Sequence, residues 1–181
     1  MNKTLTSILL AAIILIGAFL IFNFYTNKDK QEYKQTSTPK NYKEIEYMIE
    51  GKSLGIGGEL NYFGNELFTD LNDDGRDDVV FLVTHQSGGS GTFYYAVSAL
   101  DTGNGYIGSD GYLLGDRIAP QSTELSQNPK HVNVIVVNYE DRAIGEPMTT
   151  QPSIGKSAYL KLDIDRMQWG IVVPDFEGES R

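Results

Sequence analysis

The 181 residues of the sequence include no cysteine. Disulfide bonds, thiolate zinc sites, a cysteine nucleophile and a lipid-modified cysteine after a signal peptide are therefore excluded. The folded part of the chain must be stabilised by packing, with or without the help of a bound metal. Because proteins on either side of a membrane can lack cysteine, this absence does not decide the compartment.

Histidine is almost as scarce, with two residues, His85 and His131. Their positions match no zinc hydrolase motif, and no serine stands in a G-x-S-x-G elbow. Carboxylates are abundant, but a glycosidase needs two of them in one cleft, which a sequence cannot show. We identify no catalytic constellation, so the sequence favours a non-enzymatic protein.

Positive charge is in short supply after residue 50. Residues 1–50 hold 6 Lys and Arg against 5 Asp and Glu, whereas residues 51–181 hold 9 against 19. Residues 51–181 therefore carry a net charge of −10, and residues 1–50 carry +1, which gives −9 for the whole chain. Because an acidic surface repels phosphate backbones, nucleic-acid binding is disfavoured and cations are the more natural partners.

Only one long apolar run is present, residues 8–22 (ILLAAIILIGAFLIF), which extends to Tyr25 without a charge. A helix of this length, about 27 Å, is close to the thickness of the hydrocarbon core of a bilayer. A cleaved signal peptide, the alternative, would be followed by small residues, whereas the next residues here are the bulky FNFYTN. We therefore predict an uncleaved transmembrane anchor over residues 1–25.

Residues 26–44 are polar and charged, with too little apolar surface to fold on their own. We predict that they form a linker in which Tyr33 and Tyr42 are solvated. Lysines flank the apolar run on both sides, so the positive-inside rule does not decide its orientation. The short N-terminal head and the calcium loop described below favour a single-pass protein of the cell membrane with its domain on the extracytoplasmic side.

From about Ile45 the sequence consists of short apolar runs separated by Gly, Asn and Asp, which is typical of β structure. In residues 158–164 the alternation places Leu160 and Leu162 on the face opposite Tyr159. The predicted strands are 78–84, 92–100, 131–139 and 158–164, with weaker candidates at 111–118 and 167–173 and a helical turn within 42–48.

These patterns predict one all-β or β-dominated domain over residues 45–175, followed by a flexible tail at 176–181. Its expected architecture is a small antiparallel sandwich or an open barrel. No internal repeat is apparent, so the sequence does not indicate a solenoid.

The segment DLNDDGRDD, residues 70–78, fits the pattern D-x-N-x-D-G-x-x-D. Ca²⁺ takes six to eight oxygen ligands, and side chains at positions 1, 3 and 5 of a tight turn converge to supply three. We therefore predict a structural Ca²⁺ site at Asp70, Asn72, Asp74, Arg76 (through its carbonyl oxygen) and Asp78 (directly or through water). The alternative is a metal-free turn rich in Asp and Asn, in which the clustered carboxylates would repel one another.

Together with Phe63 and Gly64 upstream, this loop resembles the FG-GAP repeat, whose calcium loops lie between strands of integrin-type β-propeller blades. The resemblance covers residues 63–82 and implies calcium binding by the same loop positions. Phe81 stands where an EF-hand would have its bidentate Glu, and a strand follows where an EF-hand has a helix. A propeller needs several repeats and this chain has one, so the resemblance extends to the loop only.

Two further stretches contain Asp-Arg pairs, Asp116-Arg117 and Asp141-Arg142, and the segment GGSGTFYY precedes them. With the acidic loop, they resemble an uncharacterised family of bacterial envelope proteins, membrane-anchored or lipoproteins, over roughly residues 62–160. The pairs could clamp loops together or recognise a ligand. The glycine-rich loop is expected to be a flexible hairpin connection.

The sequence thus predicts a non-enzymatic, membrane-anchored, extracytoplasmic calcium-binding module that binds a protein or polysaccharide partner. One alternative is a cell-wall or glycan hydrolase that uses carboxylates as acid and base, which would need two carboxylates in a cleft away from the loop. The other is a structural subunit of an envelope complex, which would show an exposed apolar patch.

Overall fold

A computed structural model describes residues 41–174 of the chain. The predicted anchor at residues 1–25, most of the predicted linker and the predicted tail lie outside the described residues. Between residues 41 and 174, no helix is long and apolar enough to cross a membrane.

The described chain is β-dominated, as predicted, and its strands pair antiparallel. In chain order the elements are a short 3-10 helix η1 (Tyr42–Glu44), β1 (Glu46–Ile49), β2 (Lys52–Gly55), β3 (Leu60–Thr69), β4 (Asp78–His85), β5 (Phe93–Asp101), β6 (Tyr106–Gly108), β7 (Tyr112–Asp116), β8 (Ala119–Leu125), β9 (Val134–Asp141), β10 (Ile154–Asp163) and β11 (Gln168–Ile171).

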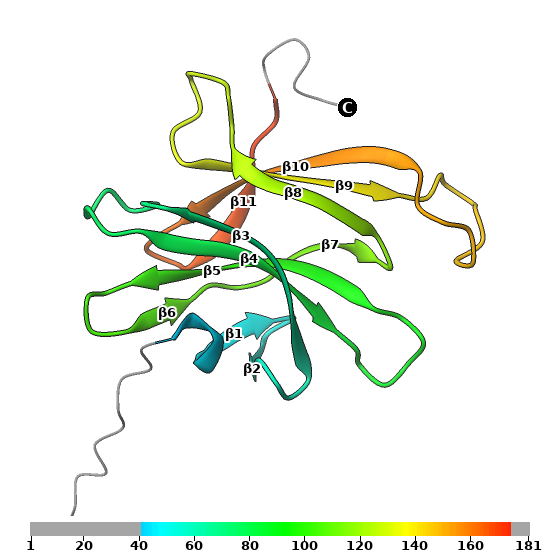
Figure 1. The fold of residues 1–181 in the computed structure, drawn as a ribbon, viewed down its shortest axis with the longest axis horizontal. Helices are drawn as coiled ribbons and strands as arrows, with labels where there is room; N and C mark the ends of the chain where they lie inside the picture. The colour runs from blue at the N-terminus through cyan, green and yellow to red at the C-terminus, as the bar shows by residue number, and fades with distance from the viewer. Residues whose placement is uncertain (1–40, 175–181) are drawn as a thin grey trace, which may run out of the picture. The chain divides into compact units, whose positions relative to one another are not determined.

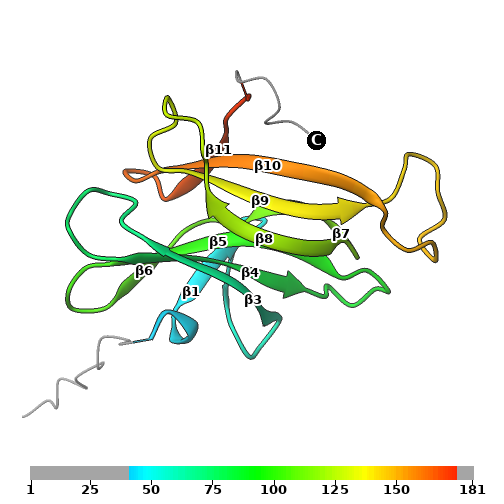
Figure 2. The same ribbon diagram turned by 45° about the horizontal axis from the view of Figure 1, so that its top comes forward.

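The strands form two large sheets and one hairpin. One sheet has the order β3-β4-β5-β6, with β7 also paired to β5, and the other has the order β11-β10-β9-β8. Figures 1 and 2 show the second sheet on one face of the first, with the β1–β2 hairpin on the other face. The domain is therefore a sandwich of two antiparallel sheets with a third, small layer.

Strand β4 lies in the middle layer and is covered on both sides. Val80 and Leu82 point into the core between the two large sheets, whereas Phe81 points toward the β1–β2 hairpin. A continuous apolar run such as VVFLV is what a strand needs when both of its faces are buried. The same run therefore supplies side chains to both cores.

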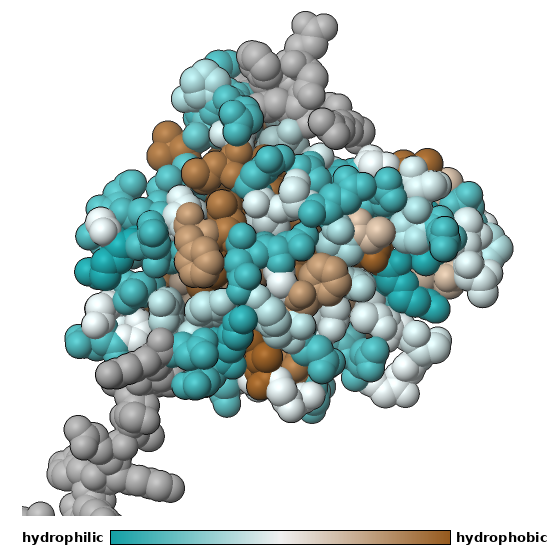
Figure 3. Space-filling model, in the orientation of Figure 1, coloured by the Kyte–Doolittle hydropathy of each residue, from teal (hydrophilic) through white to brown (hydrophobic). Residues whose placement is uncertain are grey.

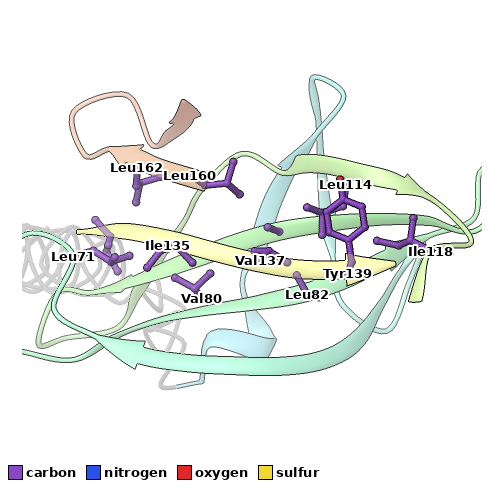
Figure 4. Close-up of a cluster of buried hydrophobic side chains, with 12 residues drawn as sticks. Leu71, Val80, Leu82, Leu114, Ile118, Ile135, Val137, Tyr139, Leu160 and Leu162 are labelled. Atoms are coloured by element: carbon purple, nitrogen blue, oxygen red, sulfur yellow. The ribbon is translucent and has the colours of Figure 1, made fainter. Parts of the chain in front are cut away.

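The core between the large sheets is formed mainly by aliphatic side chains of β4, β5, β7, β9 and β10 (Figure 4). Leu160 and Leu162 of β10 point into it, as the alternating pattern predicted. Tyr159 lies on the opposite face, where it packs with Val134 and Val136 in a small separate cluster.

The junction between β6 and β7 ties the three layers together. The backbone of Met48 in β1 accepts a hydrogen bond from Gly111 (2.8 Å) and donates one to Ser109 (3.1 Å). On the other side, the Asp110 N–H donates to the carbonyl oxygen of Met167 (2.8 Å), and the Asp110 carboxylate accepts the backbone N–H of Trp169 (2.9 Å). This short junction therefore fixes both outer layers to the central sheet.

One local prediction is wrong. Tyr42, expected to be solvated in the linker, is partly buried in η1, and its ring packs against Phe81 at a centroid distance of 5.2 Å. The physical reason is that Tyr42 covers the edge of an aromatic cluster that includes Tyr106, at 6.0 Å. Residues 41–44 thus contact the folded domain.

Candidate metal site

The acidic loop connects β3 to β4 and folds around the carboxylate of Asp70 (the loop between β3 and β4 in Figure 1). Asp70 Oδ1 accepts the N–H groups of Asn72 (3.3 Å) and Asp74 (3.1 Å), and Oδ2 accepts that of Gly75 (2.7 Å). Gly75 has φ 84°, which lets the chain reverse here. An ionised carboxylate has about four acceptor positions, so Asp70 can make these bonds and still bind a cation.

The side chains at positions 3 and 5 of the loop also turn inward. Asn72 Oδ1 accepts the Asp74 N–H (3.2 Å), and the Asn72 amide donates to Asp74 Oδ2 (3.0 Å). Asp73, between them, is exposed to solvent. The structure therefore brings Asp70, Asn72 and Asp74 together in one turn through these hydrogen bonds, although Asp74 is exposed like Asp73.

Asp78, the last predicted ligand, is fully buried at the start of β4. Its Oδ2 accepts the N–H of Leu71 (2.9 Å) and its Oδ1 accepts the N–H of Asp101 (2.8 Å). One carboxylate thus joins the beginning of the loop, the first residue of β4 and the last residue of β5. Asp78 holds the loop in place, a role that the sequence did not indicate.

The side chain of Arg76 lies across the loop. Its guanidinium pairs with the Asp74 carboxylate, and its Nε donates to the carbonyl oxygen of Asp101 (3.0 Å). The sequence predicted a role only for the carbonyl oxygen of Arg76. The guanidinium supplies a positive charge to the turn and links it to the turn after β5.

The carboxyl groups of the loop have different environments. The N–H of Gly75, with other backbone donors, lowers the pKa of Asp70, so this group is ionised near neutral pH. Burial raises the pKa of Asp78, the N–H groups of Leu71 and Asp101 offset part of this rise, and the negative charges of Asp74 and Asp70 add a smaller one. A cation in the turn would offset the repulsion among these three groups.

The three carboxylates do not meet at a single point. Among the described residues, no three His, Cys, Asp or Glu side chains are grouped closely enough to hold a metal ion. Asp74 is paired with Arg76, and both oxygens of Asp78 bond to backbone N–H groups. The oxygens that share the turn are two carboxylates, Asp70 and Asp74, and the side-chain amide of Asn72.

Arg142 and the Asp116–Arg117 ion pair form a clamp at the corner between β7 and β8, whereas the Asp141 carboxylate pairs with Lys156 (2.7 Å). Arg142 donates to the carbonyl oxygens of Thr150 (2.5 Å), Arg117 (2.9 Å) and Asp116 (3.4 Å). Arg117 pairs with the Asp116 carboxylate through Nε (3.1 Å) and a terminal nitrogen (2.9 Å), and Asp116 also accepts the Thr92 N–H (2.8 Å). The guanidinium of Arg142 therefore holds loops together, one of the two roles expected from the sequence.

A second charged cluster was missed by the sequence analysis. Lys43 of η1 forms an ion pair with Glu66 of β3 (3.4 Å) and lies over the ring of Tyr62 (3.6 Å). Lys43 belongs to the segment predicted to be a linker, and Tyr62 and Glu66 lie on a strand that the sequence did not predict. No spacing in the sequence links the three residues.

Comparisons of the chain with protein-family models, with curated proteins and with solved structures find no match.

Proposed function

We propose that this protein is a non-enzymatic calcium-binding module, anchored in the cell membrane by residues 8–22, that presents its β domain to a protein or polysaccharide partner on the extracytoplasmic side. The observation that carries the proposal is the set of hydrogen bonds that joins Asp70, Asn72 and Asp74 in one turn. A calcium loop takes side-chain oxygens from its first, third and fifth positions, and these three residues stand at those positions of the turn.

In the calcium-bound loop, the side chains of Asp70, Asn72 and Asp74 and the carbonyl oxygen of Arg76 coordinate the ion, with Asp78 adding an oxygen directly or through water. Ca²⁺ competes with the Arg76 guanidinium for Asp74, because both bind the same carboxylate. The bound ion stabilises the end of the central sheet, since Asp78 joins the loop to β4 and β5.

The edge strand that leads into the loop supports a role in partner binding. Phe63 and Phe68 of β3 are 42% and 56% exposed and lie on opposite faces of the strand, where Phe63 packs against Tyr94 and Phe68 against Tyr42. Figure 3 shows apolar residues at the surface on the side of the domain where β3 runs. Exposed aromatic side chains are typical of surfaces that bind other proteins, and they also stack on sugar rings. A calcium-stabilised loop at the end of β3 would hold this edge strand, with an exposed aromatic ring on each face, rigid.

Thermal unfolding of the full-length protein tests the calcium site. Because the ion binds the folded loop and hardly the unfolded chain, a hundredfold excess over Kd adds about 2.7 kcal/mol of stability. We expect the melting temperature in excess Ca²⁺ to be several degrees above that in chelator, as followed by circular dichroism.

Variants of the loop provide the controls for that experiment. Asp74→Ala should abolish the calcium response, whereas Asp73→Ala, its exposed neighbour, should retain it. Arg76→Gln removes the competing cation and should lower the calcium Kd roughly three- to tenfold. Identical melting temperatures of the unmodified protein in Ca²⁺ and in chelator would show that the loop is an ordinary acidic turn.

Membrane fractionation tests the anchor. Expressed in bacteria, the full chain should sediment with membranes and resist extraction by alkaline carbonate, because its apolar run is long enough to span the bilayer. Recovery of a soluble product that begins near residue 26 would instead identify residues 1–25 as a cleaved signal peptide.

A further inference from the structure

Lys43 lies in a cage formed by two tyrosine rings and a carboxylate, those of Tyr42, Tyr62 and Glu66. Its Nζ is 3.6 Å from the centroid of the Tyr62 ring, 5.3 Å from that of Tyr42 and 3.4 Å from Glu66 Oε1. An ammonium group over aromatic faces and beside a carboxylate is bound by the ring quadrupoles and by the opposite charge.

The walls of this cage are held by contacts that do not involve Lys43. The hydroxyl groups of Tyr42 (2.6 Å) and Tyr62 both donate to Glu66 Oε1. Both rings also pack on the buried Phe81, with centroid distances of 5.2 and 5.7 Å. The cage is therefore preorganised, and it should persist when the lysine side chain leaves.

The ionisation states of the cage suit a cation. The hydrogen bond from Tyr42 lowers the pKa of Glu66, so the carboxylate is ionised near neutral pH. Burial raises the pKa of Tyr42 to about 12, which keeps its ring neutral. Without Lys43 the cage would carry one uncompensated negative charge beside two aromatic faces.

The Lys43 side chain reaches the cage from the surface of the domain. It is 36% exposed and projects from a helix of three residues. Its four-carbon stem can swing into solvent by rotation about side-chain bonds alone. A ligand can therefore replace the ammonium group without unfolding any strand.

We propose that the cage of Tyr42, Tyr62 and Glu66 is a binding site for an organic ammonium group and that Lys43 occupies it as an intramolecular competitor. The ligand is a small methylated ammonium compound or the lysine side chain of a protein partner, which both present a singly charged ammonium group to the cage. The net negative charge of residues 51–181 favours the approach of either one. Neither the calcium loop nor the membrane anchor is needed for this site.

Ligand-observed NMR titration of the full-length protein in a non-ionic detergent tests the proposal. The probes are tetramethylammonium and the Nα-acetyl, C-terminal methylamide derivative of lysine. Because a tethered competitor acts at an effective concentration in the millimolar range, Lys43→Ala and Lys43→Gln should each lower the Kd of the preferred probe at least fivefold. Lys52→Ala, which removes one positive charge from exposed strand β2, should leave the Kd unchanged.

A second substitution identifies the cage as the site of binding. Glu66→Gln, added to Lys43→Gln, keeps the size of the side chain but removes its charge, and it should raise the Kd again at least fivefold. Tighter binding of tetramethylammonium would identify a small methylated compound as the ligand of the cage. Tighter binding of the lysine derivative would identify the lysine side chain of a protein partner. The proposal is overturned if both Lys43 variants, with unchanged melting temperatures, bind neither probe more tightly than the unmodified protein.

Discussion

Replacing Asp78 with alanine is expected to lower the free energy of unfolding by about 3–5 kcal/mol. The carboxylate is fully buried and accepts the N–H groups of Leu71 and Asp101. Alanine would leave both donors without a partner, and each unsatisfied buried group costs about 1–3 kcal/mol. The loop would also lose its connection to the end of β5. Because the lost hydrogen bonds are all between protein groups, the loss is expected without bound calcium as well.

Urea denaturation in the presence of chelator measures this effect without a contribution from the metal. Asp78→Asn retains one acceptor oxygen but places an amide against the second N–H, so its cost should be intermediate, about 2 kcal/mol. Asp77→Ala is the matched control, since Asp77 is exposed, and it should change stability by less than about 0.5 kcal/mol. A loss for Asp78→Ala as small as that of the control would contradict the anchoring role.

The strands predicted from the sequence are those whose apolar side chains have a regular pattern. Strand β4 was recognised by its continuous apolar run, and β10 by strict alternation from Ala158 onward. The observed β10 starts earlier, at Ile154, because Gly155 and Lys156 pair with β9 although they bury little surface. Residues 131–139 were predicted as a strand, and β9 begins three residues later, at Val134.

The missed strands lack such a pattern for identifiable reasons. In β3, Gly64 and Asn65 have positive φ angles and shift the register against β4, so the alternation is lost halfway along the strand. In β8, Pro120 cannot donate a ladder hydrogen bond, and the strand tolerates it because it lies at the edge of its sheet. The predicted helical turn is confirmed only for Tyr42–Glu44, after which the chain continues as β1.

The candidate site combines local contacts, which the sequence indicates, with contacts between distant residues, which it does not. The hydrogen bonds that join Asp70, Asn72 and Asp74 are local to one turn, and the spacing of these residues in the sequence indicates that they share it. The anchoring role of Asp78 depends on Asp101, 23 residues further along the chain, which only the pairing of β4 with β5 brings close. The cage around Lys43 depends in the same way on the packing of η1 against a bulged strand.

Phe81 connects these features, because it supports the cage and lies in the strand that begins with Asp78. Its side chain is fully buried, and its ring contacts those of Tyr42, Tyr47 and Tyr62 at centroid distances of 5.2, 5.5 and 5.7 Å. Its neighbours from the central sheet in this core include Val79, Val83, Val97 and Ala99, which are too small to fill the space of a lost ring. The stability of the third layer should therefore depend strongly on it.

We expect Phe81→Ala to lower the free energy of unfolding by about 3–5 kcal/mol, because it removes a buried ring and leaves a cavity that the sheet cannot close. Phe81→Leu keeps most of the volume and should cost about 1–1.5 kcal/mol. Phe68→Ala is the matched control: Phe68 belongs to the same aromatic cluster but is 56% exposed, so its loss should be below about 1 kcal/mol. Equal losses for Phe81→Ala and Phe68→Ala in urea denaturation would contradict this account of the core, because they would mean that the buried ring contributes no more to packing than the exposed one.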